Sequence, residues 1–292
     1  MGLKAGIIGL PNAGKSTIFN ALTQSGIPAE NYPFCTIDPN VGIVNVPDFR
    51  LYKLADIFKP GKITPATMEF LDIAGLVKGA SHGEGLGNQF LSHIRDVDAV
   101  IHVVRLFEDE NVSHVEGCLD PTRDIEIVET ELLMRDIASI ERRMEKLQKT
   151  ARIGDEESKI DLAVLEIILP QINDGILVHN IKLEEIQHQR IAQMALLTAK
   201  PVLYVANVDE EEILAESRSE TIQKLFAFAK NRGNAAIRLC GNLEAEIATL
   251  PDKEKPTFLL EYNLPEPGLE KLIHASYKLL GLETFFTGGD KQ

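Results

Sequence analysis

The feature that most constrains the fold of this chain is a glycine-rich segment close to its N-terminus. Residues 9–16 read Gly-Leu-Pro-Asn-Ala-Gly-Lys-Ser and match the pattern G-x-x-x-x-G-K-S of a phosphate-binding loop. An apolar run over 5–10 precedes the loop and a helix-like stretch over 16–22 follows it, which is the context that the motif requires. In that context, successive backbone N–H groups and a helix N-terminus surround a phosphate. The segment therefore predicts a nucleotide site.

Individual roles follow from the position of each loop residue. Lys15 is placed to reach the β- and γ-phosphates, and the Ser16 hydroxyl is placed to bind Mg²⁺. Four further residues are predicted to contact the nucleotide: Asn12, Ala13, Gly14 and Thr17. A glycine-rich turn between a strand and a helix, with no ligand, is the alternative. The combination of motif and context favours the phosphate site.

The composition is that of an ordinary globular protein, with 44% apolar and 25% charged residues in 292 positions. Residues 1–20 hold the glycine loop and Lys15 where a secretory signal would continue its apolar core, and no run predicts a membrane span. The three cysteines lack the spacing of a metal site and are interpreted as reduced thiols. We expect a cytoplasmic monomer without membrane attachment. The net charge of −14 means that contact with nucleic acid would need a local basic patch.

Strand and helix patterns alternate in the first third of the chain, stop near residue 123 and resume near residue 201. Strands are expected at Ala5–Gly9, Gly42–Val46, Met68–Ile73, Ala99–Val104, Val202–Asn207 and Ala235–Leu239. The charge-rich middle block predicts helices at Arg123–Thr150, Glu156–Leu169 and Glu184–Thr198. The sequence therefore predicts an α/β P-loop NTPase fold, doubly wound around a mostly parallel sheet, with an inserted all-helical, coiled-coil-like arm. The predicted units are 1–122 and 201–282 for the two parts of the NTPase domain and 123–200 for the arm.

Two further segments contain candidate residues for binding Mg²⁺ and the γ-phosphate. Asp72 and Gly75 form a D-x-x-G pattern at the end of the third predicted strand, where ligands of a doubly wound sheet bind. We expect Asp72 to hold Mg²⁺ and the Gly75 amide to face the γ-phosphate. Thr36, in the segment between the P-loop and D-x-x-G, is predicted to complete the Mg²⁺ ligands when the γ-phosphate is bound. A turn aspartate and a loop threonine are the plainer interpretations.

The segment expected to read the base departs from the pattern N-K-x-D of a guanine site. Asn207 is followed by Val208, and Glu210 stands where the aspartate would be. Loss of the bidentate guanine contact should remove discrimination of about 1–3 kcal/mol, so we favour ATP over GTP. A degenerate guanine site stays open as the alternative. Asn207 can still tie the base loop to the P-loop, and Cys240 with Gly241 is placed to close over the base.

The residue after D-x-x-G also differs from that of many GTPases. Leu76 stands where a glutamine would orient the attacking water, so hydrolysis is expected to be slow. The glycine-rich stretch 78–88 contains His82 and Glu84, either of which could take that role. We name His82, with Lys15, as the catalytic candidates. A solvated loop histidine is the plainer interpretation of His82.

Taken together, these segments are similar to the Obg-like ATPase (YchF) family of P-loop NTPases. The resemblance rests on residues 9–17, 32–40, 72–88 and 114–126 and runs almost the full length. It implies an ATPase with altered base recognition, ribosome association, a role in translation or stress response, and a hydrophobic residue in place of the catalytic glutamine, as Leu76 is. Asn12 matches an asparagine linked in relatives to potassium-stimulated turnover, so the resemblance admits K⁺ beside Mg²⁺.

The resemblance also implies a C-terminal TGS domain after the stretch that begins at Leu282. This chain ends at Gln292. We therefore expect residues 283–292 to be a stub that leads toward a TGS domain which the chain lacks. Functions that need the TGS surface are then in doubt, whereas nucleotide chemistry is not.

The first helix of the predicted arm carries a basic stripe. Arg135, Arg142, Lys146 and Lys149 fall on one face by their spacing. Our hypothesis is that this stripe faces RNA or the ribosome on an otherwise acidic protein. A solvated helix face with ordinary ion pairs is the plainer interpretation, and the sequence alone slightly favours it.

Three functions are compatible with the motifs. The leading one is an ATP-hydrolysing switch that binds ATP and ADP and docks on the ribosome. The second is a nucleotide-gated binding protein whose hydrolysis is incidental. A small-molecule P-loop kinase ranks third, since Thr36, the D-x-x-G pattern and Asn207 form the layout of a switch.

Overall fold

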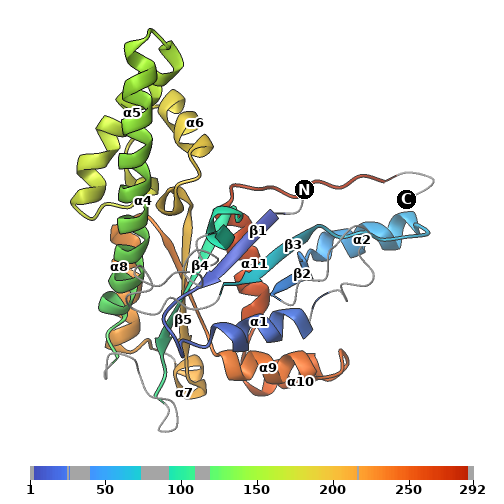
Figure 1. Cartoon of the computed structure of the whole chain (residues 1–292). Coiled ribbons are helices and arrows are strands. Elements are labelled where there is room, and N and C mark those ends of the chain that lie inside the picture. Colours follow the sequence, from blue (N-terminus) through green and yellow to red (C-terminus); the bar gives the residue numbers. More distant parts are fainter. Residues whose placement is uncertain are drawn as a thin grey trace.

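The protein is organised around a six-stranded sheet in the order β2-β3-β1-β4-β5-β6 (Figure 1). The computed structural model describes residues 3–24, 26, 40–73, 92–108, 119–215 and 217–288. The strands are β1 (Leu3–Ile8), β2 (Val41–Asn45), β3 (Thr67–Asp72), β4 (Ala99–Leu106), β5 (Val202–Val208) and β6 (Ala235–Leu239). Only β2 runs antiparallel to its neighbour, and every other pairing is parallel. The predicted doubly wound, mostly parallel fold is therefore confirmed.

Helices cover both faces of the sheet. The helices of the described residues include α1 (Lys15–Gln24), α2 (Phe49–Phe58), α4 (Pro121–Arg152), α5 (Glu156–Asn173), α6 (Glu185–Gln193), α7 (Glu210–Leu214), α8 (Glu220–Asn231), α9 (Gly241–Thr249), α10 (Lys255–Glu261) and α11 (Gly268–Leu279), with short 3-10 turns η3 (Val178–Asn180) and η4 (Leu197–Ala199). Helices α1 and α11 pack on one face, and α4 and α8 on the other.

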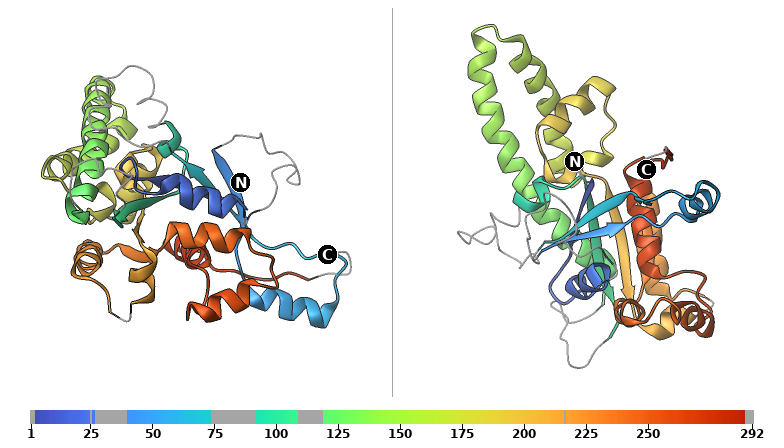
Figure 2. Two further views of the ribbon diagram at one scale, coloured as in Figure 1. Left: turned by 90° about the horizontal axis from the view of Figure 1, so that it is seen from below. Right: turned by 90° about the vertical axis from the view of Figure 1, so that its right-hand side faces the viewer.

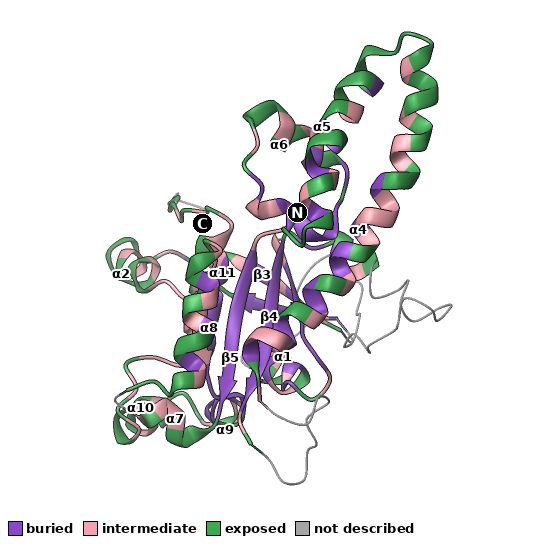
Figure 3. Cartoon of the chain, turned by 90° about the vertical axis from the view of Figure 1, so that its left-hand side faces the viewer, coloured by how far each residue is buried: buried purple, intermediate pink, exposed green. Residues whose placement is uncertain are grey.

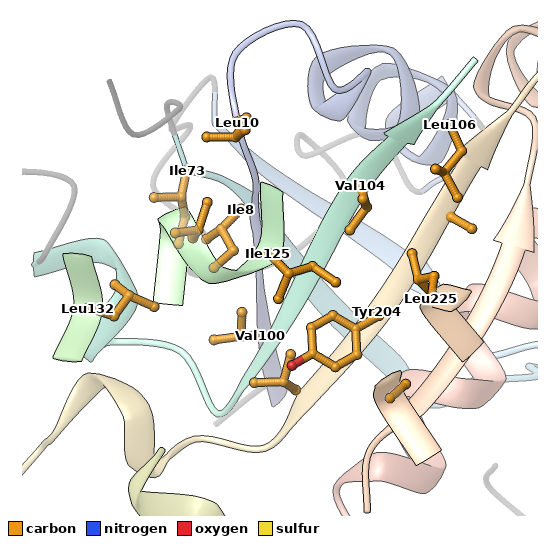
Figure 4. Packing of buried hydrophobic residues seen from close by; sticks show 14 of the residues in the cluster. Ile8, Leu10, Ile73, Val100, Val104, Leu106, Ile125, Leu132, Tyr204 and Leu225 are labelled. Atoms are coloured by element: carbon orange, nitrogen blue, oxygen red, sulfur yellow. The ribbon is translucent and has the colours of Figure 1, made fainter. Parts of the chain in front are cut away.

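Burial of the central strands explains their almost uninterrupted apolar sequence. Every residue of β4 and β5 is buried, because alternate side chains enter the cores on opposite faces (Figure 3). Val100, Val104 and Tyr204 point to the core under α4 and α8, where Ile125 and Leu225 meet them (Figure 4). No helix among the described residues is both long enough and apolar enough to cross a membrane.

Helices α4, α5 and α6 form an arm that projects beyond the sheet (Figures 1 and 2). Asp120 caps the start of α4, where its side chain accepts a hydrogen bond from the Arg123 N–H, and Pro121 occupies the first turn. The chain reverses at Gly154, whose φ of +96° suits glycine, and Asp155 then caps α5. The arm contains its own apolar cluster, which joins Ile140 of α4 to residues of α5 and α6. The limits of 123 and 200 for this unit stay a prediction.

Buried polar groups hold the base of the arm to the sheet. The Asp136 carboxylate accepts hydrogen bonds from the backbone N–H groups of Leu197 (2.9 Å) and Thr198 (2.8 Å) and from the Thr198 hydroxyl (2.7 Å). The Tyr204 hydroxyl of β5 donates to Glu129 of α4 at 2.5 Å. These contacts explain why the helix predicted over 184–198 ends at Gln193, since the following residues turn back to reach Asp136.

We predict that Asp136→Ala lowers the free energy of unfolding by roughly 2–4 kcal/mol, because two buried backbone N–H groups and a hydroxyl lose their acceptor. Urea unfolding followed by circular dichroism measures this difference. Glu141→Ala, at an exposed position of the same helix, is the control and should change stability by less than about 0.5 kcal/mol. Equal losses in the two variants would show that Asp136 does not anchor the arm.

Candidate nucleotide-binding site

The loop between β1 and α1 can be formed only with glycine at two of its positions. Gly9 has φ +150°, and a Cβ on it would lie 2.3 Å from the backbone oxygen of Val103. Gly14 has φ +89°, and a Cβ there would lie 2.1 Å from Nδ2 of Asn207. The two glycines of the motif therefore let the loop pass directly against β4 and β5. This close approach places the P-loop over the carboxyl ends of the parallel strands.

Lys15 opens α1 and is almost completely buried, with 7% of its surface exposed. Its ammonium donates a hydrogen bond to the Leu10 carbonyl at 2.8 Å and is thus held along the loop. Burial lowers the pKa of Lys15, and the nearby Asp72 carboxylate opposes that shift. A cation with few solvating partners, aimed along a loop of backbone amides, is suited to bind the charge of a phosphate.

The structure brings together two of the three predicted metal ligands. The Ser16 hydroxyl donates to Asp72 Oδ2 at 3.0 Å, although the two residues are 56 positions apart. The other oxygen, Asp72 Oδ1, is buried and has no hydrogen-bond partner among the described residues. A hydroxyl and a carboxylate with a free buried oxygen are the hard ligands that Mg²⁺ prefers, so these residues fit the ion.

Asn207, the last but one residue of β5, connects the loops on either side of the site. Its side-chain amide donates to the Ala13 carbonyl at 2.9 Å, and its Oδ1 accepts from the Gly241 N–H at 2.9 Å. Asn207 is 4% exposed, so both bonds are shielded from water. One side chain thereby fixes the P-loop relative to the start of α9.

The remaining residues predicted to bind the base differ in how they could contact it. Val208 and Cys240 are 2% and 3% exposed, so only their backbone atoms can face a nucleotide. Burial raises the pKa of the Cys240 thiol. Asp209 caps α7, where its carboxylate accepts from the Glu212 N–H at 2.8 Å, and Glu210 is exposed in the first turn. The Asp209 and Glu210 side chains are therefore both at the surface, and the Asp209 carboxylate is engaged in the helix cap.

The sequence analysis did not single out two residues, Arg105 and Phe107, which also lie at the carboxyl end of a parallel strand, where ligands of such a sheet bind. Arg105 lies near the end of β4 and donates from Nε to the Phe107 carbonyl at 3.1 Å, while its guanidinium lies 4.6 Å from the Phe107 ring centroid. The Phe107 ring lies beside Gly14, with Cε1 3.9 Å from the position of a Cβ on that glycine. A charged residue at the end of an otherwise apolar strand was the available signal.

Several predicted residues lie outside the described part of the chain. They are Thr36, Gly75, Leu76, His82 and Glu84. Thr17 is described and lies half-buried in the first turn of α1, and Asn12 is exposed with φ +62°.

A parallel sheet with a P-loop after its first strand, a facing Ser–Asp pair and an asparagine bridge to the base loop define a P-loop NTPase of the GTPase type. The family model described as "50S ribosome-binding GTPase" matches residues 4–129. Proteins named "Ribosome-binding ATPase YchF" from Bacillus subtilis (strain 168) and Escherichia coli O157:H7 are each 48% identical over all of this chain and 80% of their own length. The chain belongs to the YchF family.

A solved relative supports the same conclusion about the fold. The structure titled "Structure of the Schizosaccharomyces pombe YchF GTPase" is 36% identical and superposes with a TM-score of 0.85. The match covers 99% of this chain and 78% of the fission yeast chain. The arm and the sheet therefore occur together in a relative as they do here.

His102 of β4 is a buried titratable group behind the P-loop. It is 2% exposed and its ring centroid lies 5.7 Å from that of Tyr204. Burial, assisted by the positive charge of Lys15, lowers the pKa of His102 to about 3. The folded protein therefore holds this imidazole neutral at all pH values above that.

We predict that His102 makes the fold sensitive to acid. Below the unfolded pKa of about 6.5 the unfolded chain binds a proton that the folded chain excludes, so stability falls by about 1.4 kcal/mol per pH unit until about pH 3. Urea unfolding at pH 7 and at pH 5 measures how much the free energy of unfolding falls between the two values. This fall should be smaller in His102→Gln than in the unaltered protein by about 2 kcal/mol. His188→Gln, at an exposed site, should lose as much as the unaltered protein. Identical pH dependence in all three proteins would contradict the prediction.

Proposed function

We propose that this protein is a Mg²⁺-dependent P-loop switch that binds ATP and ADP, hydrolyses ATP slowly and acts on the ribosome in translation or stress regulation. The observation that carries the proposal is the convergence of Lys15, Ser16 and Asp72 at the ends of parallel strands. The relatives from Bacillus subtilis and Escherichia coli are named ribosome-binding ATPases. Family membership at 48% identity over the whole chain supports the same activity here.

Each described residue has a defined task in this proposal. Lys15 and the backbone of Asn12, Ala13 and Gly14 bind the phosphates, and Ser16 and Asp72 would hold Mg²⁺. When bound, Mg²⁺ neutralises charge that develops on the phosphate oxygens. Asn207 holds the P-loop and the Gly241 loop in register around the nucleotide.

Thr36, Gly75 and His82 complete the proposal from outside the described residues: a metal ligand, a γ-phosphate contact and a group that positions water. Slow turnover follows from Leu76, which cannot orient water. K⁺ near Asn12 is the proposed accelerating cation. We further propose that the protein is a cytoplasmic monomer.

The preference for adenine is the point on which the names of the relatives differ, since the fission yeast structure is titled a GTPase. We predict that ATP and ADP bind at least about tenfold more tightly than GTP and GDP, because Glu210 and Val208 do not rebuild the guanine contact. Calorimetric titration of the four nucleotides with Mg²⁺ measures this ratio. Ser16→Ala is the control: it should weaken both triphosphates while the ratio of the two stays the same. Tighter guanine binding would make the protein a GTPase with a degenerate base motif.

We infer that the arm is the ribosome-facing element. Arg142, Lys146 and Lys149 on α4 are exposed, and no ion pair joins them to another described residue. Arg135 is different from the other members of the predicted stripe, since it is 26% exposed and lies 3.5 Å from Glu131. The part of the stripe available to RNA phosphates is therefore the outer half of α4.

Reversal of this charge tests the inference. The double variant Arg142→Glu, Lys146→Glu is expected to weaken co-sedimentation with ribosomes at least about fivefold, and added salt should weaken binding of the unaltered protein in the same way. The control is Lys224→Glu, Lys230→Glu on α8, which makes the same change in net charge at exposed sites on a helix that packs beside the N-terminal half of α4, where Arg232 pairs with Glu129. Equal sedimentation of the two double variants would exclude the stripe as a contact.

A further inference from the structure

His179 connects the arm to the sheet through both nitrogens of its ring. It lies in η3, shortly after α5, and is partly buried. Nδ1 lies 3.1 Å from the backbone oxygen of Thr198 in η4, and Nε2 lies 3.2 Å from Oδ1 of Asn234, just before β6. The arm projects from the end of the sheet at which β5 begins, a few residues after Thr198 (Figure 1). His179 therefore bridges the base of the arm and the edge strand of the sheet.

Both partners of His179 are held in place by other hydrogen bonds. The Asp136 carboxylate accepts from the N–H of Thr198 at 2.8 Å and from its hydroxyl at 2.7 Å. The same hydroxyl accepts from the Val178 N–H at 3.4 Å. The backbone N–H of Asn234 donates to the Ala229 carbonyl at 2.9 Å. The bridge is therefore made between two fixed groups, and its two bonds depend on the state of the imidazole.

The partners determine which proton each ring nitrogen carries. A backbone oxygen can only accept, so Nδ1 carries a hydrogen and donates it to Thr198. Nε2 faces the Asn234 amide, which presents its oxygen or its nitrogen according to how the amide is turned. With Oδ1 toward the ring, Nδ2 is buried and lacks a hydrogen-bond partner among the described residues. With the amide turned over, Nδ2 donates to a neutral Nε2, and the oxygen lies toward the Tyr204 hydroxyl.

A neutral ring thus satisfies this contact better than a protonated ring does. A protonated ring needs Oδ1 toward it, which leaves Nδ2 buried without an acceptor. Burial lowers the pKa of His179, the hydrogen bonds to Thr198 and Asn234 oppose that shift, and the charge of Arg232 adds to it. The folded contact therefore excludes a proton that a solvated histidine would bind.

The charged groups on the elements around His179 are engaged with other partners. Glu129 of α4 pairs with Arg232 at the end of α8. Asp136 of α4 accepts from two backbone N–H groups and a hydroxyl. Lys200, after η4, donates to two backbone carbonyls. In the part of the chain that the structure describes, a protonated His179 would therefore meet the charge of Arg232 rather than a carboxylate that is free to pair with it.

We propose that His179 is an acid-sensitive latch between the arm and the sheet. The neutral ring holds η3 to Asn234, and protonation breaks that bond and lets η3 separate from the sheet. The closed latch has its full stability above about pH 6.5, the pKa of a solvated histidine, and weakens as the pH falls below that value. This regulation concerns the attachment of the arm and does not depend on the proposed ATPase activity or on the ribosome.

Hydrogen exchange followed by mass spectrometry at pH 7.5 and pH 5.5 tests the latch, with labelling times scaled for the intrinsic pH dependence of amide exchange. Amides of residues 176–181 and 197–199 are expected to exchange faster at pH 5.5. The expected increase is at least about threefold and at most about tenfold, because the open state gains one proton over this range.

Three variants separate the latch from other effects of acid. His179→Gln cannot be protonated, so the increase should disappear. His188→Gln, at an exposed site of α6 in the same arm, is the matched control and should retain it. His102→Gln should also retain it, because His102 acts on unfolding of the whole sheet and the latch opens locally.

Asn234→Asp should reverse the sign of the response. A carboxylate beside Nε2 favours the protonated ring and raises the pKa of His179 above its ordinary value. The bond is then present at pH 5.5 and is lost as the pH rises through the raised pKa. The same amides should therefore exchange more slowly at pH 5.5 than at pH 7.5 in this variant.

Three results would overturn the proposal. They are an equal pH response in His179→Gln and the unaltered protein, an unreversed response in Asn234→Asp, and loss of the response in His102→Gln. The last result would show that these amides exchange only through unfolding of the whole sheet. A general loss of stability in His179→Gln would speed exchange equally at both pH values and leave the measured ratio unchanged.

Discussion

The two hydrogen bonds of the Asn207 amide join the P-loop to the start of α9, and the site has its shape because of them. Ala13 and Asn207 are 194 positions apart, yet the bond between them is 2.9 Å long and buried. Gly14 has no Cβ, which is what lets this amide approach the loop. The backbone amides of the loop are therefore held in place before any phosphate arrives, so little ordering is left to oppose binding.

Strand β5 relates the arm to the site. Tyr204, near the arm, donates to Glu129 of α4, and Asn207, three residues on, holds the P-loop. Every residue of β5 between them is buried within the sheet, so the strand is a rigid connection. Strand β5 therefore connects a residue that anchors the arm directly to the residue that holds the P-loop.

Three titratable groups, Lys15, Asp72 and His102, determine the charge at the nucleotide site. Lys15 has its pKa lowered by burial, Asp72 offers the opposing charge, and His102 behind the loop stays neutral. A protonated His102 would place a second positive charge beside Lys15 in a buried region. Because the chain carries a net charge of −14, the exposed cations on the outer half of α4 form the kind of local basic patch that contact with RNA would need.

The sequence by itself determined the P-loop, the apolar strands, the charge-rich helices of the arm and the residues that depart from a guanine site. These depend on residues adjacent in the chain and on periodicity, and the resemblance to the YchF family added the overall fold. The tertiary structure alone decided that Ser16 meets Asp72, that Asn207 lies between Ala13 and Gly241, and that the chain leaves its helix after Gln193 to reach Asp136. It also decided that α2, an apolar helix by composition, stays exposed. Such features come from contacts between distant residues, whose free energy overrides local preference and leaves no periodic trace in the sequence.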